Sequence, residues 1–485
     1  MSFGKSLFKD FTIYGFAGVI GKLLALITLP IISRVFSVEE YGIIETINSS
    51  MAFFPLLIGL GYDMAIKKSV LIDADDYVSR KTLVSTVFWF LVAWGGLCSS
   101  VLFTLSGPIS KALFGSDYYV SAIRISIINV YLSLLLGLSL TILRVYFKVA
   151  SFSLISIVRV ILDYSLIMIF VVLYNLGING YFFAFLITTA SLLVLGAILI
   201  KKDLSFSFDF SELKKVLQYS IPLLAGSLAF WVFNLSDRIV LSALSDVNQT
   251  GIYSMAVRMV SVLPFVIMAF KNAWVPRAFQ YYRKNEEEFL RILNSIHAYG
   301  LAFFSVLAIG NLVFARVMLV IFTTEKFFEA LYIMWPLCLA YIFYPLTSVG
   351  AIGIYLSNKT KYVTFISWVG ALTNIVINII FVKRFGAIVA SISTALSYIV
   401  IYVLYWRTSE KLMNWKIHYT KPAAIVGLAL LAILAVQLVR IETVFLDLMI
   451  KLFILLIFVV LLFAFGVFRF SEIKKYFGGR KRNGL

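Results

Sequence analysis

Residues 219–271 of this chain read YSIPLLAGSLAFWVFNLSDRIVLSALSDVNQTGIYSMAVRMVSVLPFVIMAFK. The stretch contains two apolar runs, each long enough to cross a lipid bilayer, around a short polar segment at 242–250. The first run contains Asp237 and Arg238, and the second contains Arg258. A charge at membrane depth costs a few kcal/mol unless it faces a partner or a water-filled cavity. We therefore expect two helices that line a polar path through the membrane.

The composition of the whole chain indicates a polytopic membrane protein. Of its 485 residues, 61% are hydrophobic and 14% are charged, whereas soluble domains have about 45–50% and about 25%. The first apolar run follows Lys5 and Lys9 and is too long for a signal-peptide core, so we expect an uncleaved first helix. Both cysteines lie in apolar runs and the two histidines are far apart, so no disulfide, metal site or cofactor is expected.

Long apolar runs divide the chain into about 14 predicted transmembrane helices, which defines an all-α integral membrane protein. Runs of this length and continuity do not fit the strands of a membrane barrel. The predicted spans are about 11–33, 41–66, 82–106, 119–143, 152–174, 180–200, 217–241, 251–271, 294–316, 330–356, 362–382, 386–406, 422–439 and 444–468.

The positions of the basic residues predict the orientation. With the N-terminus inside, the inner segments hold 29 of the 42 lysines and arginines, and the outer loops hold 6. The positive-inside rule then places both termini in the cytoplasm. The net charge of +18 is thus a topology signal, and nucleic acid is not an expected partner. The longest predicted loops, 67–81, 201–216 and 272–293, are all on the cytoplasmic side.

A weak internal repeat predicts two lobes. Gly42 and Gly251 open two spans, Gly177 and Gly386 open two others, and both pairs are 209 residues apart. Six spans per repeat give both halves the same orientation, with a pseudo-two-fold axis along the membrane normal. We therefore expect an N-lobe at 1–205, a C-lobe at 206–420, and two additional helices with a basic cytoplasmic tail at 421–485.

Charged residues inside the predicted spans are the candidate functional residues, because such residues mark substrate or ion pathways. Arg159 and Asp163 are four residues apart on one helix face, so they can form an ion pair, which we treat as a structural alternative. Arg316 and Lys451 lie near span ends, where long side chains reach the interface, and we exclude them. The candidate cavity cations are Lys22, Arg124, Arg159, Arg238 and Arg258, and the candidate ion-coupling acids are Glu45, Asp63, Asp163 and Asp237.

Seven short motifs follow one another along the chain. They are Pro30-Ile-Ile-Ser-Arg34, Ser37-Val-Glu-Glu-Tyr41-Gly42, Leu60-Gly-Tyr-Asp63-Met-Ala65, Asn234-Leu-Ser-Asp237-Arg238, Gly251-Ile-Tyr253-Ser254, Ala273-Trp274-Val-Pro276, and Phe385-Gly386-Ala through Ser391 to Tyr398. Their order and spacing are more specific than any one of them. Together they resemble the polysaccharide-export branch of the multidrug/oligosaccharidyl-lipid/polysaccharide exporter superfamily, most closely the O-antigen-unit (Wzx-like) flippases.

The resemblance implies two six-helix lobes around a central cavity. It implies a transporter that moves undecaprenyl-pyrophosphate-linked oligosaccharides, used for O-antigen, lipopolysaccharide or a similar surface polysaccharide, to the outer leaflet of the bacterial cytoplasmic membrane. Coupling to H⁺ or Na⁺ and contact with other polysaccharide-assembly proteins are implied in the same way. The chain's own charges agree, because buried phosphates need counter-charges and arginine suits phosphate.

Three other functions are compatible with parts of the sequence. A multidrug exporter of the same superfamily has fewer spans as a rule, and a cationic cavity suits organic cations poorly. A lipid II flippase is a near relative whose motifs match less well. A membrane-embedded polymerase or acyltransferase needs a large outer loop or a catalytic set, and neither is visible. We therefore expect a transporter and not an enzyme.

Overall fold

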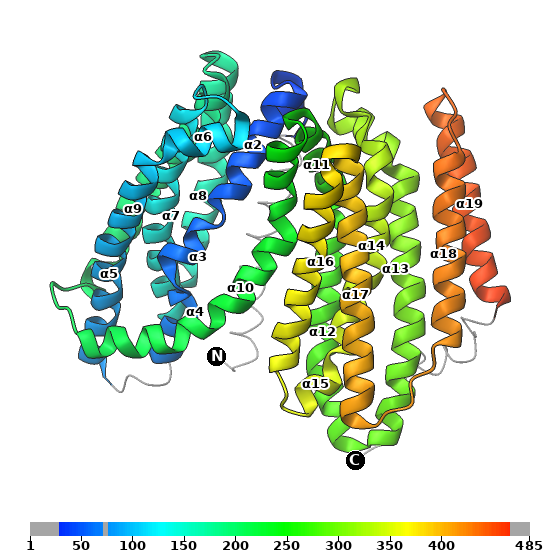
Figure 1. The fold of residues 1–485 in the computed structure, drawn as a ribbon. Helices are drawn as coiled ribbons and strands as arrows, with labels where there is room; N and C mark the ends of the chain where they lie inside the picture. Colours follow the sequence, from blue (N-terminus) through cyan, green and yellow to red (C-terminus); the bar gives the residue numbers. More distant parts are fainter. Residues whose placement is uncertain (1–28, 71–75, 466–485) are drawn as a thin grey trace. The chain divides into compact units, whose positions relative to one another are not determined.

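The computed structural model describes residues 29–70 and 76–465 (Figure 1). Within these ranges the regular structure is helical and contains no strand. Twelve helices are long and apolar enough to cross a membrane, and one further bent pair, α11 and α12, passes the same test as a single span. These match the predicted spans from 41–66 onward, which confirms the all-helical fold class. The predicted span at 11–33 lies mostly outside the described residues.

The helices follow one another with short connections. Residues 29–35 are helical, and the labelled elements after them are α2 (Val38–Met51), α3 (Phe54–Gly59), α4 (Tyr62–Lys68), α5 (Tyr77–Thr104), α6 (Ser106–Phe114), α7 (Val120–Val145), α8 (Val149–Ile167), the π-helix η2 (Met168–Leu173), α9 (Gly177–Ile200), η3 (Lys201–Asp203), α10 (Phe210–Leu244), α11 (Val247–Val260), α12 (Val262–Lys284), α13 (Glu286–Phe322), η4 (Glu325–Phe327), α14 (Ala330–Gly350), α15 (Ile352–Leu356), α16 (Lys361–Phe385), α17 (Ala387–Met413), α18 (Thr420–Leu438) and α19 (Val444–Ala464).

The described chain forms two compact units. The first consists of the residues up to Gly251 together with Phe322–Thr324, and the second of Ile252–Ile321 and the residues from Glu325 onward. The boundary falls inside α11. The predicted division at residue 205 concerns the internal repeat and stays a prediction.

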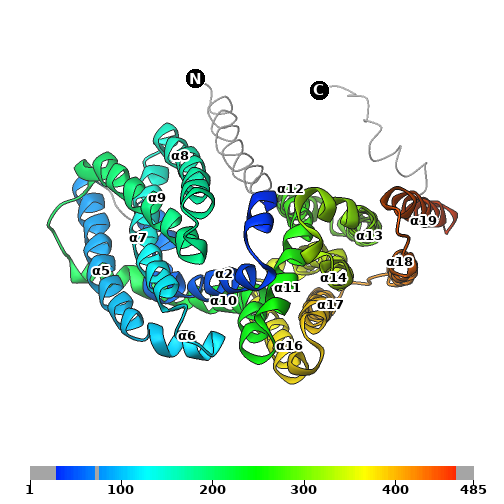
Figure 2. The same cartoon turned by 90° about the horizontal axis from the view of Figure 1, so that it is seen from above.

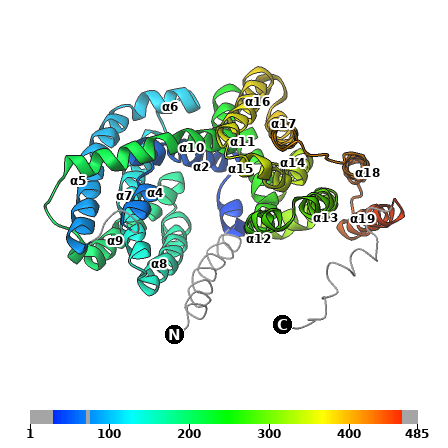
Figure 3. The same ribbon diagram turned by 90° about the horizontal axis from the view of Figure 1, so that it is seen from below.

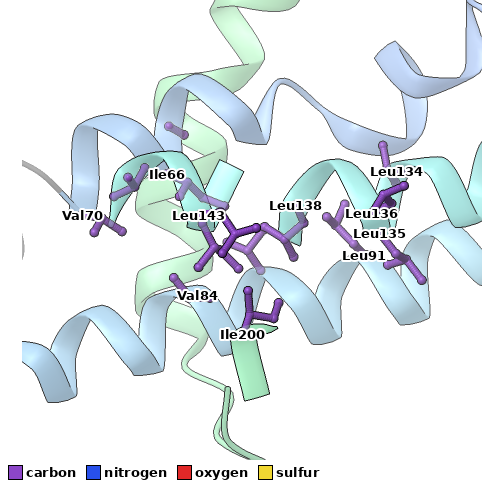
Figure 4. Close-up of a cluster of buried hydrophobic side chains, with 14 of the residues drawn as sticks. Ile66, Val70, Val84, Leu91, Leu134, Leu135, Leu136, Leu138, Leu143 and Ile200 are labelled. Atoms are coloured by element: carbon purple, nitrogen blue, oxygen red, sulfur yellow. The ribbon is translucent and has the colours of Figure 1, made fainter. Parts of the chain in front are cut away.

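The first unit is built around α7. This helix packs against α5, α8 and α9, and Figure 2 shows it between α5 and α9. Its leucines and isoleucines enter a cluster with residues from α5, α9 and α10, part of which is drawn in Figure 4. Lipid tails are as apolar as these side chains, so the helices associate through close van der Waals packing and hydrogen bonds.

The predicted span 41–66 is interrupted twice. Pro55 lies in the first turn of α3, after a break that follows α2. Leu60 and Gly61 then adopt left-handed backbone with φ of 48° and 74°, and α4 begins at the next residue. Gly61 favours this region because it lacks a Cβ. The break places Asp63 in a separate short helix near the end of the span.

Two glycines bring α2 and α11 into backbone contact. A Cβ on Gly42 would lie 2.1 Å from the carbonyl oxygen of Val247, and one on Gly251 would lie 2.1 Å from the carbonyl oxygen of Val38. The contact is reciprocal, and neither carbonyl can move without shifting its helix. Gly42 and Gly251 are also one of the two glycine pairs that define the predicted repeat. Each glycine of the pair therefore allows its own helix to approach the other.

The second unit is centred on α14, most of whose residues are buried within the protein. It packs against α17, and α17 packs along α16. Figures 2 and 3 show α18 and α19 side by side at the edge of this unit. The α16–α17 interface contains a hydrogen-bonded amide network, in which Asn378 Nδ2 donates to Asn374 Oδ1 (3.2 Å) and Ser393 Oγ donates to Asn378 Oδ1 (3.1 Å).

Two expected loops are largely helical. The segment 272–293, expected as a cytoplasmic loop, continues α12 to Lys284 and begins α13 at Glu286. The polar segment 242–250 is reduced to Ser245 and Asp246 between α10 and α11. Polar residues extend helices beyond the apolar run, and hydropathy alone does not report this extension because it marks only the part inside lipid.

We predict that Gly42→Ala destabilises the protein, because the added methyl group meets a backbone carbonyl. Overpacking of this kind costs about 1–3 kcal/mol. Thermal unfolding of the purified protein in detergent can be followed by a thiol-reactive dye, since Cys338 is buried. The control is Gly226→Ala in α10, where a Cβ would have nothing within 4 Å and helix propensity favours alanine. Equal melting temperatures for Gly42→Ala and wild type would contradict the close contact.

Candidate functional site

A buried ion pair joins α2 and α10 in the first unit. Arg238 is 7% exposed, and its Nε lies 3.5 Å from Oε2 of Glu45. The arginine Nη1 also donates to the carbonyl oxygen of Asn234 at 3.3 Å. Arg238 thus receives a carboxylate partner from another helix, and Glu45 is held as its counter-ion. The pair unites one predicted cavity cation with one predicted coupling acid.

Asp237 and Arg258 are two further charged residues of the segment 219–271. Asp237 is 1% exposed on α10, next to Arg238 in the chain but on a different side of the helix. Arg258 is half-buried in the last turn of α11 and belongs to the second unit. Ser261 caps this end of α11, because both its N–H and its hydroxyl donate to the Arg258 carbonyl oxygen.

Asp63 lies at the centre of a cationic cluster. It pairs with Lys67 one turn further along α4, and Nη2 of Arg144 on α7 lies 3.4 Å from its Oδ1. The hydroxyl of Thr141 donates to the same carboxylate oxygen. The guanidinium of Arg144 also covers the ring of Phe152 at 5.3 Å. Two cations around one carboxylate leave a local excess of positive charge, which the sequence did not indicate, because Lys67 and Arg144 were assigned to loops.

Arg159 and Asp163 form the ion pair that their spacing on α8 predicts. Nε of Arg159 lies 3.8 Å from Oδ2 of Asp163, whose side chain is 12% exposed. The other carboxylate oxygen, Oδ1, is buried without a hydrogen-bond partner among the described residues, as is the hydroxyl of Thr188 on α9. The π-helix η2 begins five residues after Asp163, and π-helical turns are frequent at functional sites.

The remaining predicted cations lie apart from these pairs. Arg124 is exposed at the start of α7, where its Nε donates to Ser106 Oγ at 2.9 Å and its guanidinium covers the Phe103 ring at 4.8 Å. Lys22 lies outside the described residues. In the first unit, each of Glu45, Asp63 and Asp163 therefore has a cationic neighbour. Whether these residues act on a substrate or an ion stays a prediction.

A cavity of about 650 Å³ in the second unit contains a lysine that the sequence analysis did not select. Lys271 is the last residue of the predicted span 251–271, whereas in the structure it lies inside α12, after a 45° bend between α11 and α12. Its Nζ lies 3.6 Å above the ring of Tyr344. Trp274 and Ala278, both buried, continue the apolar helical pattern beyond Lys271. This continuation is the sequence feature that indicates a helix at Lys271. The cavity is lined by Lys271, Asn272, Val275, Pro276, Phe279, Thr347, Ser348, Ala351, Tyr355 and Tyr405.

The excluded residues Arg316 and Lys451 form an internal cluster with Asp447, which the sequence analysis omitted. Asp447 is 2% exposed, and Lys451 Nζ lies 2.9 Å from its Oδ2. The guanidinium of Arg316 lies 4.0 Å from Asp447 Oδ1 and donates to the carbonyl oxygens of Ile441 and, at 2.7 Å, Glu442. Both cations therefore have a carboxylate partner, which stands one turn before Lys451 in α19. Their position relative to the membrane interface stays a prediction.

Comparison with protein-family models identifies a match over the first part of the chain. A family model described as "Polysaccharide biosynthesis protein" matches residues 7–282. The chain belongs to this family. The match contains all the predicted site residues and also Lys271, so the charged residues described above on α2, α4, α7, α8, α10, α11 and α12 lie within the matched region.

Two curated relatives of this polysaccharide biosynthesis protein are distant. An uncharacterized membrane protein of Methanocaldococcus jannaschii is 20% identical over 61% of this chain, and the match spans 60% of that relative's length. An uncharacterized membrane protein of Haemophilus influenzae is 22% identical over 64% of this chain and 73% of its own length. The chain thus spans less than two thirds of the first relative, and neither comparison supplies an activity.

Two solved structures share the fold. One is the lipid II flippase MurJ in an inward closed conformation, with a TM-score of 0.73 at 15% identity. The match covers 94% of this chain and 100% of the MurJ chain. An inward-facing multidrug resistance MATE family transporter of the MOP superfamily has a TM-score of 0.61 at 15% identity over 80% of this chain and 95% of its own. The polysaccharide biosynthesis family member therefore has the fold of MOP-superfamily flippases and transporters.

We predict that Asp447→Asn loosens α19 from α13, because Arg316 and Lys451, both partly buried, lose the charge of the buried carboxylate. Removing one partner of a buried ion pair costs about 3–5 kcal/mol. The measurements are the melting temperature in detergent and limited proteolysis of the α18–α19 connection. The control is Arg440→Gln, since Arg440 is exposed and only covers the ring of Tyr332 at 4.7 Å. If both variants behave like wild type, the cluster does not hold α19 in place.

Proposed function

We propose that this member of the polysaccharide biosynthesis family flips undecaprenyl-pyrophosphate-linked oligosaccharide units, such as O-antigen or lipopolysaccharide repeat units, to the outer leaflet of the bacterial cytoplasmic membrane. One observation carries the proposal: the region matched by the family model, 7–282, contains the Arg238–Glu45 and Arg159–Asp163 ion pairs. Charged groups in apolar helices are costly and mark transport pathways.

The chemistry of the substrate supports this use of the charges. A pyrophosphate and its sugars cannot cross hydrocarbon alone, because buried anions need partners. Arg124, Arg159, Arg238, Arg258 and Lys22 are the proposed counter-charges, and the polyprenyl tail stays in lipid. With the inside negative, moving two negative charges outward gains about 4–5 kcal/mol per 100 mV, at about 2.3 kcal/mol per charge.

The acidic residues give the transporter a way to use an ion gradient. We propose that Glu45, Asp63, Asp163 and Asp237 exchange H⁺ or Na⁺ with the solvent. Glu45 is the strongest candidate, because a proton on its carboxylate would release Arg238 from the ion pair that now holds it. Arg238 would then be available to a phosphate, so protonation and substrate binding would compete for one arginine. Alternating access of the two proposed lobes, 1–205 and 206–420, would move the substrate.

A multidrug exporter remains the second candidate, and a lipid II flippase the third, because both share the fold at the level of the solved structures. Organic cations would be repelled by the excess of arginine and lysine in the helices. The chain is proposed to act as a transporter and not as an enzyme, with the lipid-linked oligosaccharide and membrane lipids as partners and other assembly proteins of the same polysaccharide as further ones.

We predict that Arg258→Ala and Arg238→Ala abolish surface polysaccharide while the protein remains inserted in the membrane. The cause is the loss of counter-charge for the pyrophosphate. The measurement is surface polysaccharide together with protein abundance in membrane fractions. The control is Arg291→Ala, because the Arg291 side chain is 73% exposed and Glu287, with which it pairs, is exposed as well, at 78%. Normal polysaccharide in both arginine variants would exclude the roles assigned to them.

Deletion of the protein in its native host tests the function as a whole. We expect single, unpolymerised lipid-linked units to accumulate on the cytoplasmic face, and surface polysaccharide to disappear. Accumulation on the outer face would show that the block follows translocation, as it does for a polymerase. No accumulation would favour export of a different solute, which a drug-susceptibility comparison would then identify.

We also predict that both termini are cytoplasmic, from the distribution of basic residues. A fluorescent protein that matures only in the cytoplasm, fused after residue 485, should fluoresce, and a periplasmic phosphatase fused at the same position should be inactive. The opposite result would reverse the proposed orientation and therefore the proposed cytoplasmic location of the basic segments.

A further inference from the structure

The cavity that contains Lys271 has a cation and no acid. Its other lining residues are apolar, aromatic, hydroxyl-bearing or an amide, and none carries a carboxylate. Within residues 29–70 and 76–465 no ion pair is formed by Lys271. This separates it from Arg238, Arg159 and Lys451, each of which lies beside an acid. An unneutralised cation in a partly enclosed space favours an anionic ligand.

An aromatic ring, and not a carboxylate, holds the lysine in place. Lys271 Nζ lies over the Tyr344 ring at 3.6 Å, and Tyr344 is supported by Tyr398 with ring centroids 4.7 Å apart. A cation–π contact fixes the ammonium group but does not neutralise its charge. Carboxylate oxygens would accept hydrogen bonds from the three N–H donors of the ammonium, whereas a ring face leaves these donors available. Lys271 is therefore positioned and remains able to bind an anion.

The rest of the lining suits a sugar. Thr347 and Ser348 donate their hydroxyl protons to the carbonyl oxygens of Tyr344 and Pro345 at 2.6 and 2.7 Å, so their oxygens remain acceptors for sugar hydroxyls. Phe279 and Tyr355 are 39% and 36% exposed and offer ring surface to the apolar face of a sugar. The volume of about 650 Å³ lies within the range of about 300–1,000 Å³ found for small-molecule sites.

We propose that this cavity, which we call the Lys271 pocket, is a second anion subsite that binds the anionic group of a lipid-linked saccharide, with the adjoining sugar against Phe279 and Tyr355. The proposal rests on the proposed function. Lys271 is thirteen residues beyond Arg258, which corresponds to roughly 20 Å along the helices at 1.5 Å per residue. The two cations therefore hold an anion at different depths. By the proposed orientation the Lys271 pocket is nearer the cytoplasm, so it receives the substrate first.

Two parts of such a substrate could supply the anion: the pyrophosphate that links the lipid, or the carboxylate of an acidic sugar. The full-length protein is purified in detergent and titrated calorimetrically with geranyl pyrophosphate and, separately, with glucuronate. The variants are Lys271→Gln and Lys271→Arg. The matched control is Lys284→Gln, an exposed lysine in the last turn of the same helix. Melting temperatures verify that each variant is folded.

We expect Lys271→Gln to weaken geranyl pyrophosphate binding by about tenfold or more, as removal of a charged hydrogen-bond donor does, and Lys271→Arg and Lys284→Gln to bind like wild type. Lys271-dependent binding of glucuronate alone would support the pocket and assign the anion to an acidic sugar. Wild-type affinity of Lys271→Gln for both probes, or no binding of either probe to the wild type, would overturn the proposal.

The outcome is separable from that of the proposed function. Lys271-dependent binding together with no accumulation of lipid-linked units after deletion would keep the anion site and exclude the flippase. Accumulation of lipid-linked units on the cytoplasmic face, together with probe binding that is the same in wild type and Lys271→Gln, would support the flippase function and exclude the Lys271 pocket as an anion site.

Discussion

The cost of placing charge in an apolar environment is the constraint on which this molecule depends. Its helices are apolar enough to cross a membrane, yet they contain arginines, lysines and acids. Arg238 with Glu45, Arg159 with Asp163, and Lys451 and Arg316 with Asp447 show one solution, in which each cation lies beside a carboxylate. Lys271 shows another, in which a tyrosine ring supports the cation.

These two solutions would have different consequences in the proposed function. A paired arginine would have to exchange its carboxylate for a substrate phosphate, so the binding of a proton or Na⁺ to the acid would control it. A lysine on a ring has no carboxylate to exchange and would bind an anion directly. In the proposal, the transporter receives its anionic substrate at the second kind of site and couples movement to ions at the first.

Small residues allow the helices to approach one another closely. This matters because helices in lipid have no hydrophobic driving force to associate and depend on close packing. Gly42 and Gly251 bring the backbones of α2 and α11 into contact, and Gly370 approaches Ile401 so closely that a Cβ would lie 2.2 Å from it. The buried Asn374 and Asn378 of α16 add hydrogen bonds to Ser393 of α17. Polar and small residues therefore specify which apolar helices are neighbours.

The sequence by itself determined the helices and their class, because the length of an apolar run is a local property set by the thickness of the bilayer. It also determined the Arg159–Asp163 pair, since a spacing of four places both on one helix face. Only the tertiary structure decided that Glu45 faces Arg238, that Arg144 reaches Asp63, and that Lys271 lines a cavity. These partners come from helices far apart in the chain, and their meeting depends on packing that no local pattern encodes.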